Sequence, residues 1–311
     1  MSFRRRKMKK LALALVAIVL ALVVYSVVSA TQSTEEVKKP VPKKPTTQTV
    51  SVTADDISKG QLVLINADHE VNDKAVPEDL VTLSKHPKLI KNFTTADDSI
   101  KISRDMLSAF KQMIQDAKKD NVTHFVINSS YRSKKVQAEL YRTKGADIAL
   151  PAGASEHNLG LSMDIGSSLG LMENAEEGKW LAKNAAKYGF ILRYPSDKTD
   201  ITGIQYEAWH FRYVGLPHSL IMQKRDWVLE EYMNYLKKHD ALTTTVNGMT
   251  YTIEHHDVKA TGTTTIEVPL EQSYTVSGDN DQGVILTIWN PQEDPQQQEA
   301  ANQTTTTKKQ Q

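Results

Sequence analysis

The most hydrophobic stretch of the chain lies near its start. Residues Leu11–Val28 form a run of 18 residues in which only Tyr25 and Ser26 interrupt the apolar pattern, and the preceding MSFRRRKMKK carries six lysines and arginines. A helix of 18 residues spans about 27 Å, close to the hydrocarbon thickness of a bilayer. A basic segment before such a run is typical of an export signal. We expect residues 1–30 to anchor the protein in the bacterial cytoplasmic membrane by one helix, with the remainder extracellular; a cleaved signal peptide is the alternative.

Two segments have too few apolar residues to form a core. Residues 31–54 include TQSTEEVKKPVPKKP, whose prolines and lysines favour an extended linker. Residues 291–311 are rich in Gln and Thr and are predicted to form a disordered tail. The folded part is therefore expected between residues 55 and 290.

Between residues 55 and 240, helical and strand-like spacings of apolar residues alternate irregularly. One helical face, for example, would carry Met106, Phe110 and Ile114. This irregular alternation predicts an α+β domain rather than a doubly wound parallel sheet. The elements expected from the pattern are helices over 103–118, 133–144, 180–188 and 220–236, and strands over 61–66 and 123–130.

After residue 240 the pattern changes to short β-rich runs. Strand-like residues flank Asn247-Gly248, and the Asn-Gly pair is a strong hairpin signal. The runs TTTIEVPL, SYTVSG and VILTIW continue in the same style. We expect a small all-β C-terminal module over residues 241–290, in which the sequence shows no evident chemistry.

Composition narrows the chemistry that the chain can perform. Its net charge of +1 gives no general attraction to nucleic acid. It contains no cysteine, which excludes disulfides and thiolate metal ligands. A metal would therefore be bound by His, Asp and Glu, and a catalytic nucleophile would be Ser, Thr, a carboxylate or an activated water.

Among the nine histidines, His157 and His210 have neighbours suited to metal chemistry. His157 stands in SEHNLGLSMDIG, seven residues before Asp164, and His210 follows Glu207 in YEAWHFRYVG. A hydrolytic zinc site commonly uses three His or carboxylate ligands and leaves a fourth position for water. The pattern predicts His157, Asp164 and His210 as ligands, with the unligated Glu207 as the base that takes a proton from this water.

Strand geometry restricts which neighbouring residues can share a site. Side chains alternate between the faces of a strand, so the adjacent His255 and His256 are disfavoured as a ligand pair. Residues 207 and 210 would also face opposite sides of a regular strand. If both serve one metal site, the backbone must bend or turn between them.

Three segments together closely resemble the VanY family of zinc D,D-carboxypeptidases. They are SSYRSKKVQ, SEHNLGLSMDIG and LRYPSDKTDITGIQYEAWHFRYVG, and the similarity runs through about residues 55–240. The spacing S-x-H-x-x-G-x-x-x-D followed by E-x-W-H is specific, and ALPAGASEHNLGLSMDIGSSL looks like the VanY proteins of vancomycin resistance. The resemblance implies a single zinc-peptidase domain with a small antiparallel sheet flanked by helices.

The resemblance also implies a role for each matching residue. His157, Asp164 and His210 match the zinc ligands, and Glu207 matches the catalytic base. Arg132 matches an arginine that binds the substrate and stabilises the oxyanion, in keeping with the affinity of guanidinium groups for carboxylates and developing oxyanions. The other matching residues are expected to bind the substrate or shape its pocket: Gln137, Ser155, Tyr194 and Trp209.

The implied activity is metal-assisted removal of the terminal D-Ala from peptidoglycan precursor pentapeptides that end in D-Ala-D-Ala, which contributes to vancomycin resistance. One alternative is an L,D-carboxypeptidase that acts on stem tetrapeptides, since it would share the scaffold and the zinc site. Another is a non-catalytic cell-wall binding protein, although an intact Glu207 argues against it. A serine D,D-peptidase would need an S-x-x-K element, and the serines beside the motifs do not have this spacing.

Overall fold

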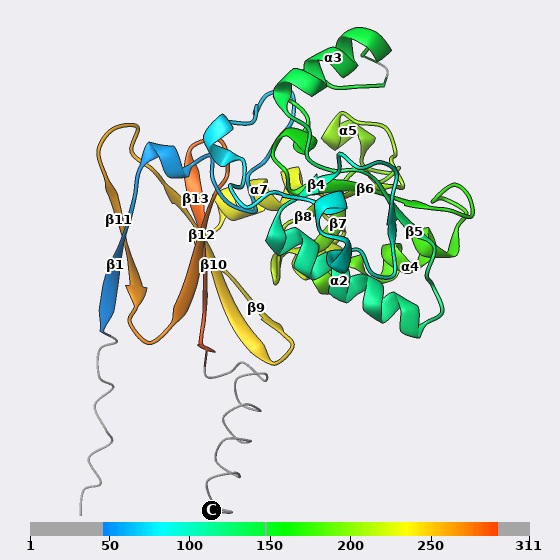
Figure 1. Ribbon diagram of the computed structural model, residues 1–311. Coiled ribbons are helices and arrows are strands. Elements are labelled where there is room, and N and C mark those ends of the chain that lie inside the picture. The colour runs from blue at the N-terminus through cyan, green and yellow to red at the C-terminus, as the bar shows by residue number, and fades with distance from the viewer. Residues whose placement is uncertain (1–45, 147, 292–311) are drawn as a thin grey trace, which may run out of the picture. The chain divides into compact units, whose positions relative to one another are not determined.

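The computed structural model describes residues 46–146 and 148–291 (Figure 1). The expected membrane anchor, the greater part of the expected linker and nearly all of the expected tail lie outside these residues. Among the helices of the described part, none combines the length and the apolar composition that a bilayer span requires.

A five-stranded sheet carries the candidate site. Its strand order is β3-β5-β6-β8-β7, in which β3 pairs with β5 in parallel and all other neighbours are antiparallel. The predicted α+β class is therefore confirmed. The strands are β3 (Thr94–Thr95), β5 (Phe125–Ser129), β6 (Ser162–Ser167), β7 (Phe190–Leu192) and β8 (His210–Tyr213).

One face of this sheet is covered by helices. The predicted apolar face of the first helix, which includes Met106, Phe110 and Ile114, is buried and packs on the sheet, in one cluster with Phe125, Ile165 and Phe211. Because side chains alternate along a strand, Asp164 and His210 lie on the opposite face. The helices are α2 (Arg104–Lys119), α3 (Lys134–Lys144), α4 (Glu176–Asn184), α5 (Thr199–Thr202), α6 (His218–Arg225) and α7 (Leu229–Lys238).

Short elements complete the chain around this sheet. The two-stranded pair β2 (Val81–Thr82) and β4 (Lys101–Ile102) precedes α2. The 3-10 turns are η1 (Ala54–Asp56), η2 (Asp73–Ala75), η3 (Leu83–Lys85), η4 (Pro87–Leu89), η5 (Glu156–Asn158) and η6 (Ala185–Tyr188).

The prediction of one long helix over 220–236 is wrong, because the structure has two shorter ones. α6 ends at Arg225, the next residue Asp226 is left-handed with φ of 54° and ψ of 48°, and α7 begins at Leu229. A left-handed residue cannot continue a right-handed helix. Both helices carry buried apolar residues, so the spacing of apolar residues in the sequence does not mark the break between them.

The predicted strand over Gln61–Asn66 is also absent, although its apolar residues are buried as expected. Within residues 46–146 and 148–291, no strand pairs with its main chain; instead, Arg212 donates hydrogen bonds of 2.9 and 2.8 Å to the carbonyl oxygens of Gln61 and Val63. On its other side, the Leu62 amide donates to Ser277 Oγ at 2.8 Å. The Leu64 amide donates to the Asp279 carbonyl at 3.4 Å. The buried segment therefore has the apolar composition of a strand, but its main-chain groups are bonded without a β-ladder.

The β-rich C-terminal part forms two small sheets. Asn247 and Gly248, with φ of 52° and 83°, make the predicted hairpin turn. The four-stranded sheet has the order β12-β13-β10-β9, and the other sheet pairs β11 with β1. The strands are β1 (Thr47–Val52), β9 (Leu242–Val246), β10 (Met249–Asp257), β11 (Thr264–Pro269), β12 (Ser273–Gly278) and β13 (Gly283–Trp289).

Two features of this β-rich part differ from the expected boundaries. β1 falls within residues 31–54, which were expected to be linker, and its six residues pair with β11. In addition, Ile253 and Ile285 of the β-rich part belong to the same hydrophobic cluster as Leu229 and Met233 of α7. The C-terminal strands therefore share a core with the part of the chain that precedes residue 240.

Candidate metal centre and active site

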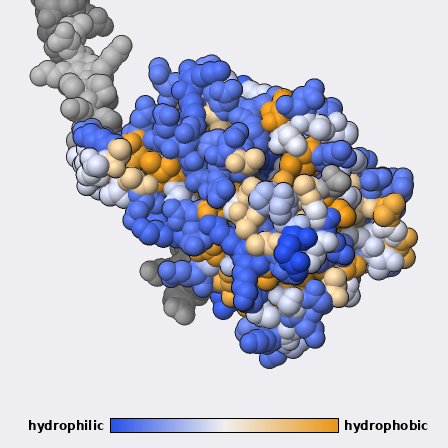
Figure 2. Space-filling view, turned by 90° about the horizontal axis from the view of Figure 1, so that it is seen from above, coloured by the Kyte–Doolittle hydropathy of each residue, from blue (hydrophilic) through white to orange (hydrophobic). Residues whose placement is uncertain are grey.

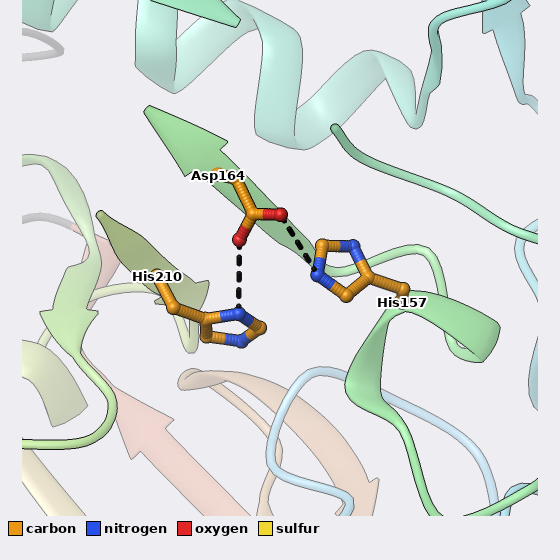
Figure 3. Close-up of side chains that lie close together, drawn as sticks. All are labelled: His157, Asp164 and His210. Atoms are coloured by element: carbon orange, nitrogen blue, oxygen red, sulfur yellow. Dashed lines mark hydrogen bonds and ion pairs between the residues drawn. The ribbon is translucent and has the colours of Figure 1, made fainter. Parts of the chain in front are cut away.

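Two neighbouring strands bring Asp164 and His210 together. They are direct partners in the antiparallel pairing of β6 with β8, on the face of the sheet opposite to α2. Asp164 Oδ1 lies 3.2 Å from His210 Nδ1, as Figure 3 shows. Cross-strand partners have adjacent side chains, so this contact follows from the register.

His157 reaches the same carboxylate from a turn. It lies on η5, just before β6, and its Nε2 is 3.4 Å from Asp164 Oδ2 (Figure 3). Its Nδ1 is 2.7 Å from the Ser130 carbonyl oxygen, which can only accept a hydrogen bond. This contact places the hydrogen on Nδ1 and leaves the Nε2 lone pair directed at the site.

Glu207 lies beside His210 because the chain turns between them. The His210 amide donates to the Glu207 carbonyl at 3.2 Å, which closes a turn over residues 208–209. Glu207 Oε2 is thereby 3.6 Å from His210 Nδ1. The expected interruption of a regular strand between residues 207 and 210 is confirmed.

The three predicted ligands form a compact donor set. One donor atom from each of His157, Asp164 and His210 lies within 4.8 Å of the other two. Two imidazole nitrogens and a carboxylate oxygen are donors that zinc prefers, and three protein ligands leave a coordination position for water or substrate. The residues present therefore fit zinc.

The local charges act on each ionisable group in a different direction. Burial on its own raises the pKa of Asp164, but His157 and His210 outweigh burial and keep this pKa far below its ordinary value. Burial lowers the pKa of His210, whereas hydrogen bonds with Asp164 and Glu156 raise it to about 9 in the metal-free site. Burial also raises the pKa of Glu207, against the opposing charge of His210.

A pocket of about 330 Å³ opens over these residues and contains the predicted substrate-binding groups. Arg132 lies on its wall, and its buried Nε has no hydrogen-bond partner in the described residues. Burial lowers the pKa of Arg132, while Asp164 and Glu207 raise it. The Gln137 amide nitrogen donates to the Leu150 carbonyl at 2.7 Å, and its buried oxygen is unpaired within the described part.

The other predicted pocket residues also line this cavity. Ser155 Oγ accepts a hydrogen bond from the His157 amide at 3.4 Å, so it caps the turn that bears the ligand. The Tyr194 ring lies 4.9 Å from the ring of His210. Trp209 is 38 % exposed and lines the pocket. On the face seen in Figure 2, hydrophobic residues lie in small groups among hydrophilic ones.

One residue of the site was missed by reasoning from the sequence. Glu156 is 1 % exposed, and its Oε2 lies 3.3 Å from His210 Nε2. Its Oε1 accepts hydrogen bonds of 2.8 Å from both Arg193 and Arg212. The available signal was weak: Arg193 and Arg212 stand inside apolar strand-like runs, where an unpaired charge would be costly.

The remaining histidine pair lies elsewhere. His255 Nε2 is 2.9 Å from Asp279 Oδ2, and His256 Nε2 is 3.0 Å from Glu254 Oε2. Each thus has its own carboxylate partner, as expected for adjacent residues on the strand β10.

Comparisons with known proteins agree with the sequence motifs. The sequence profile of a family described as "VanY: D-alanyl-D-alanine carboxypeptidase" matches residues 99–216. A D-alanyl-D-alanine carboxypeptidase of Enterococcus faecium is 51 % identical over 243 residues, which cover 78 % of this chain and 80 % of the relative. The bifunctional D-Ala-D-Ala dipeptidase and carboxypeptidase VanXYC of Enterococcus gallinarum is 31 % identical over 192 residues, 56 % of this chain and 94 % of the relative.

A solved structure extends the similarity to the fold. The vancomycin-resistance D,D-dipeptidase VanXYg, in complex with a D-Ala-D-Ala phosphinate analogue, superposes with a TM-score of 0.69 at 29 % identity. The superposition covers 79 % of this chain and 100 % of that one.

Proposed function

Since the chain belongs to the VanY family of D-alanyl-D-alanine carboxypeptidases, we propose that its pocket binds the D-Ala-D-Ala end of peptidoglycan precursor pentapeptides. We also propose that His157, Asp164 and His210 bind the catalytic zinc. The chain is a peptide hydrolase, a D,D-carboxypeptidase of the VanY type. Removal of the terminal D-Ala destroys the D-Ala-D-Ala target of vancomycin, which is how such an enzyme contributes to resistance. The observation that carries the proposal is the grouping of the three donor atoms within 4.8 Å, beneath a pocket.

The metal and the base divide the chemistry between them. Zinc in such a site supplies Lewis-acid polarisation of the carbonyl and a lowered pKa for water. Glu207 is the proton carrier: its carboxylate lies 3.6 Å from the His210 nitrogen that faces the site. It accepts a proton from the attacking water and returns one to the leaving amine.

Arg132 is the cation of the pocket that faces the reacting carbonyl. Its charge interacts with Asp164 and Glu207, so it lies on the side of the pocket where the reaction occurs. Its unpaired buried Nε–H supports a role as a donor to the developing oxyanion. The pocket residues Gln137, Ser155, Tyr194 and Trp209 would surround the terminal D-residue.

A substrate comparison tests this proposal. The purified full chain is incubated with a pentapeptide ending in D-Ala-D-Ala, the corresponding tetrapeptide, and a depsipeptide ending in D-Ala-D-lactate. We expect D-Ala to be released from the pentapeptide, and chelation to abolish the release until zinc is restored. Cleavage of the tetrapeptide alone would contradict the proposal in favour of an L,D-carboxypeptidase.

We also propose that residues 1–30 anchor the enzyme in the cytoplasmic membrane with the pocket outside. The apolar run Leu11–Val28 and the six preceding cations support this orientation. A protease added to intact cells should then digest the catalytic domain, and a chain without residues 1–30 should leave the membrane fraction. Protection of the domain in intact cells would contradict the proposed orientation.

A further inference from the structure

A buried ionic cluster lies behind His210, outside the set of residues assigned to the reaction. Glu156 is 1 % exposed, and both Arg193 and Arg212 are 0 % exposed. Desolvated charges of this kind are costly unless every group is paired. We therefore trace the hydrogen-bond partner of each charged group in the cluster.

Each arginine of the cluster is fixed at two ends. Arg193 donates from Nε to Glu156 Oε1 at 2.8 Å, and its two terminal nitrogens donate to Glu230 of α7 at 2.8 and 2.6 Å. Arg212 donates to the same Oε1 at 2.8 Å and to the backbone carbonyls of Gln61 and Val63. Glu156 Oε1 is consequently held by two donors that cannot accept a hydrogen bond.

The second oxygen of Glu156 remains for His210. Oε2 lies 3.3 Å from His210 Nε2, while His210 Nδ1 faces Asp164 and Glu207 on the pocket side. With zinc bound on the pocket side, His210 would keep a single ring hydrogen; a carboxylate can only accept, so Glu156 would hold that hydrogen on Nε2 and leave Nδ1 for the metal. The Ser130 carbonyl has the complementary effect on His157, where Nε2 is the free nitrogen.

We propose that Glu156, clamped by Arg193 and Arg212, is a positioning residue that sets the tautomer and the ring orientation of His210, so that Nδ1 is its metal-binding nitrogen. This inference rests on the proposed zinc site and deepens it. Partners of this kind, bonded to the far nitrogen of a ligand histidine, commonly change metal affinity by about 10- to 100-fold.

The arginine clamp makes the substitution Glu156→Gln unusually informative. The two arginines only donate, so the amide oxygen of the glutamine must take the position of Oε1, and the NH₂ group must face His210 Nε2. An NH₂ donor favours the lone pair on Nε2 and the hydrogen on Nδ1. The shape of residue 156 is thereby kept while the preferred tautomer of His210 is reversed.

The test measures zinc affinity of the full chain by competition with a chromophoric chelator. We expect Glu156→Gln to weaken zinc binding by at least 10-fold. The matched control is Glu177→Gln, another buried glutamate, which accepts hydrogen bonds from Ser167 Oγ and the His124 amide away from the pocket. The control should bind zinc within about twofold of the wild type, because no ligand depends on Glu177.

A second measurement uses the wild type, so it does not depend on whether a variant folds. In the zinc-loaded wild type with ¹⁵N-labelled histidine, long-range ¹H–¹⁵N spectra identify the protonated ring nitrogen. We expect hydrogen on Nε2 of His210 and on Nδ1 of His157. Hydrogen on Nδ1 of His210, or a folded Glu156→Gln chain with unchanged zinc affinity, would overturn the inference. A wild type that binds no zinc would instead contradict the proposed function itself.

Discussion

Glu207 and His210 illustrate how a few backbone atoms decide the chemistry of a residue. The turn closed by the His210 amide on the Glu207 carbonyl puts both side chains on the pocket side. Glu207 is left beside the donor set without belonging to it, 3.6 Å from His210 Nδ1. A carboxylate in this position can exchange protons with a water at the metal.

The substitution Glu207→Gln tests that role. We expect turnover of the pentapeptide to fall by about 10²- to 10⁴-fold, because an amide cannot accept the proton, whereas one zinc per chain should still bind. The measurements are kcat from D-Ala release and zinc content after dialysis. Glu139→Gln on α3 is the control, since Glu139 is exposed and pairs with Arg142. Normal turnover of Glu207→Gln would exclude Glu207 as the base.

Among single residues, those that belong to a sequence motif could be predicted, whereas a residue whose role depends on contacts with distant parts of the chain was missed. The spacing of SEHNLGLSMDIG and YEAWHFRYVG was sufficient to select His157, Asp164, His210 and Glu207, and the structure brings these four together. Glu156 adjoins His157 in the same motif, yet its position depends on Arg193, which directly follows β7, and on Arg212 of β8. Only the fold reveals that pairing.

The pair α6 and α7 shows what apolar spacing can and cannot predict about an element. Both helices and their buried faces follow from the pattern, but the left-handed residue Asp226 between them does not. Similarly, α3 nearly coincides with the predicted range 133–144, with Ser133 and Gly145 at its caps, whereas its apolar residue Val136 is 53 % exposed. Helix caps depend on neighbouring residues and are therefore predictable. The residues against which a helix face packs come from distant parts of the chain and cannot be predicted in the same way.

His218 at the start of α6 links that helix to its neighbours. Its Nδ1 lies 2.9 Å from the Tyr232 hydroxyl of α7, and its Nε2 lies 3.2 Å from Thr287 Oγ1 of β13. Burial lowers the pKa of His218 to about 3. The ring is therefore neutral in the folded protein, while in the unfolded chain it takes up a proton below about pH 6.5.

This difference predicts acid sensitivity. As the pH falls from 6.5 towards 3, the unfolded state binds the proton first, so His218 lowers the free energy of unfolding by up to about 1.4 kcal/mol per pH unit. Urea unfolding at pH 7, 6 and 5 should show a shallower decline for His218→Gln than for the wild type. His86→Gln, at an exposed position, is the control. Equal slopes for His218→Gln and wild type would contradict the assignment.

In the whole molecule, the β-rich part and the zinc-peptidase region are joined by a common core. Ile253 of β10 is 0 % exposed and belongs to the cluster that contains Leu229 and Met233 of α7. The hairpin at Asn247-Gly248 was predictable because its turn chemistry is local. The pairing of β1 with β11 joins opposite ends of the described chain, and such pairings leave no local pattern.

The shared core predicts that the two parts unfold together. Ile253→Ala should lower the free energy of unfolding by about 2–5 kcal/mol. The urea concentration at which half of the D-Ala release is lost should fall by the same amount as the urea midpoint of unfolding. Leu270→Ala is the control, because Leu270 is 54 % exposed. Fluorescence and activity should report one transition. An Ile253→Ala chain that keeps the wild-type midpoint of activity would indicate that the β-rich part unfolds separately.

The most direct test of the account is to locate the metal. Crystals of the zinc-loaded protein, measured at the zinc absorption edge, should give one anomalous peak at about 2.0–2.2 Å from His157 Nε2, an Asp164 carboxylate oxygen and His210 Nδ1. A peak bound by other residues, such as His255 and His256, or no peak at these three side chains in an active enzyme, would contradict the account.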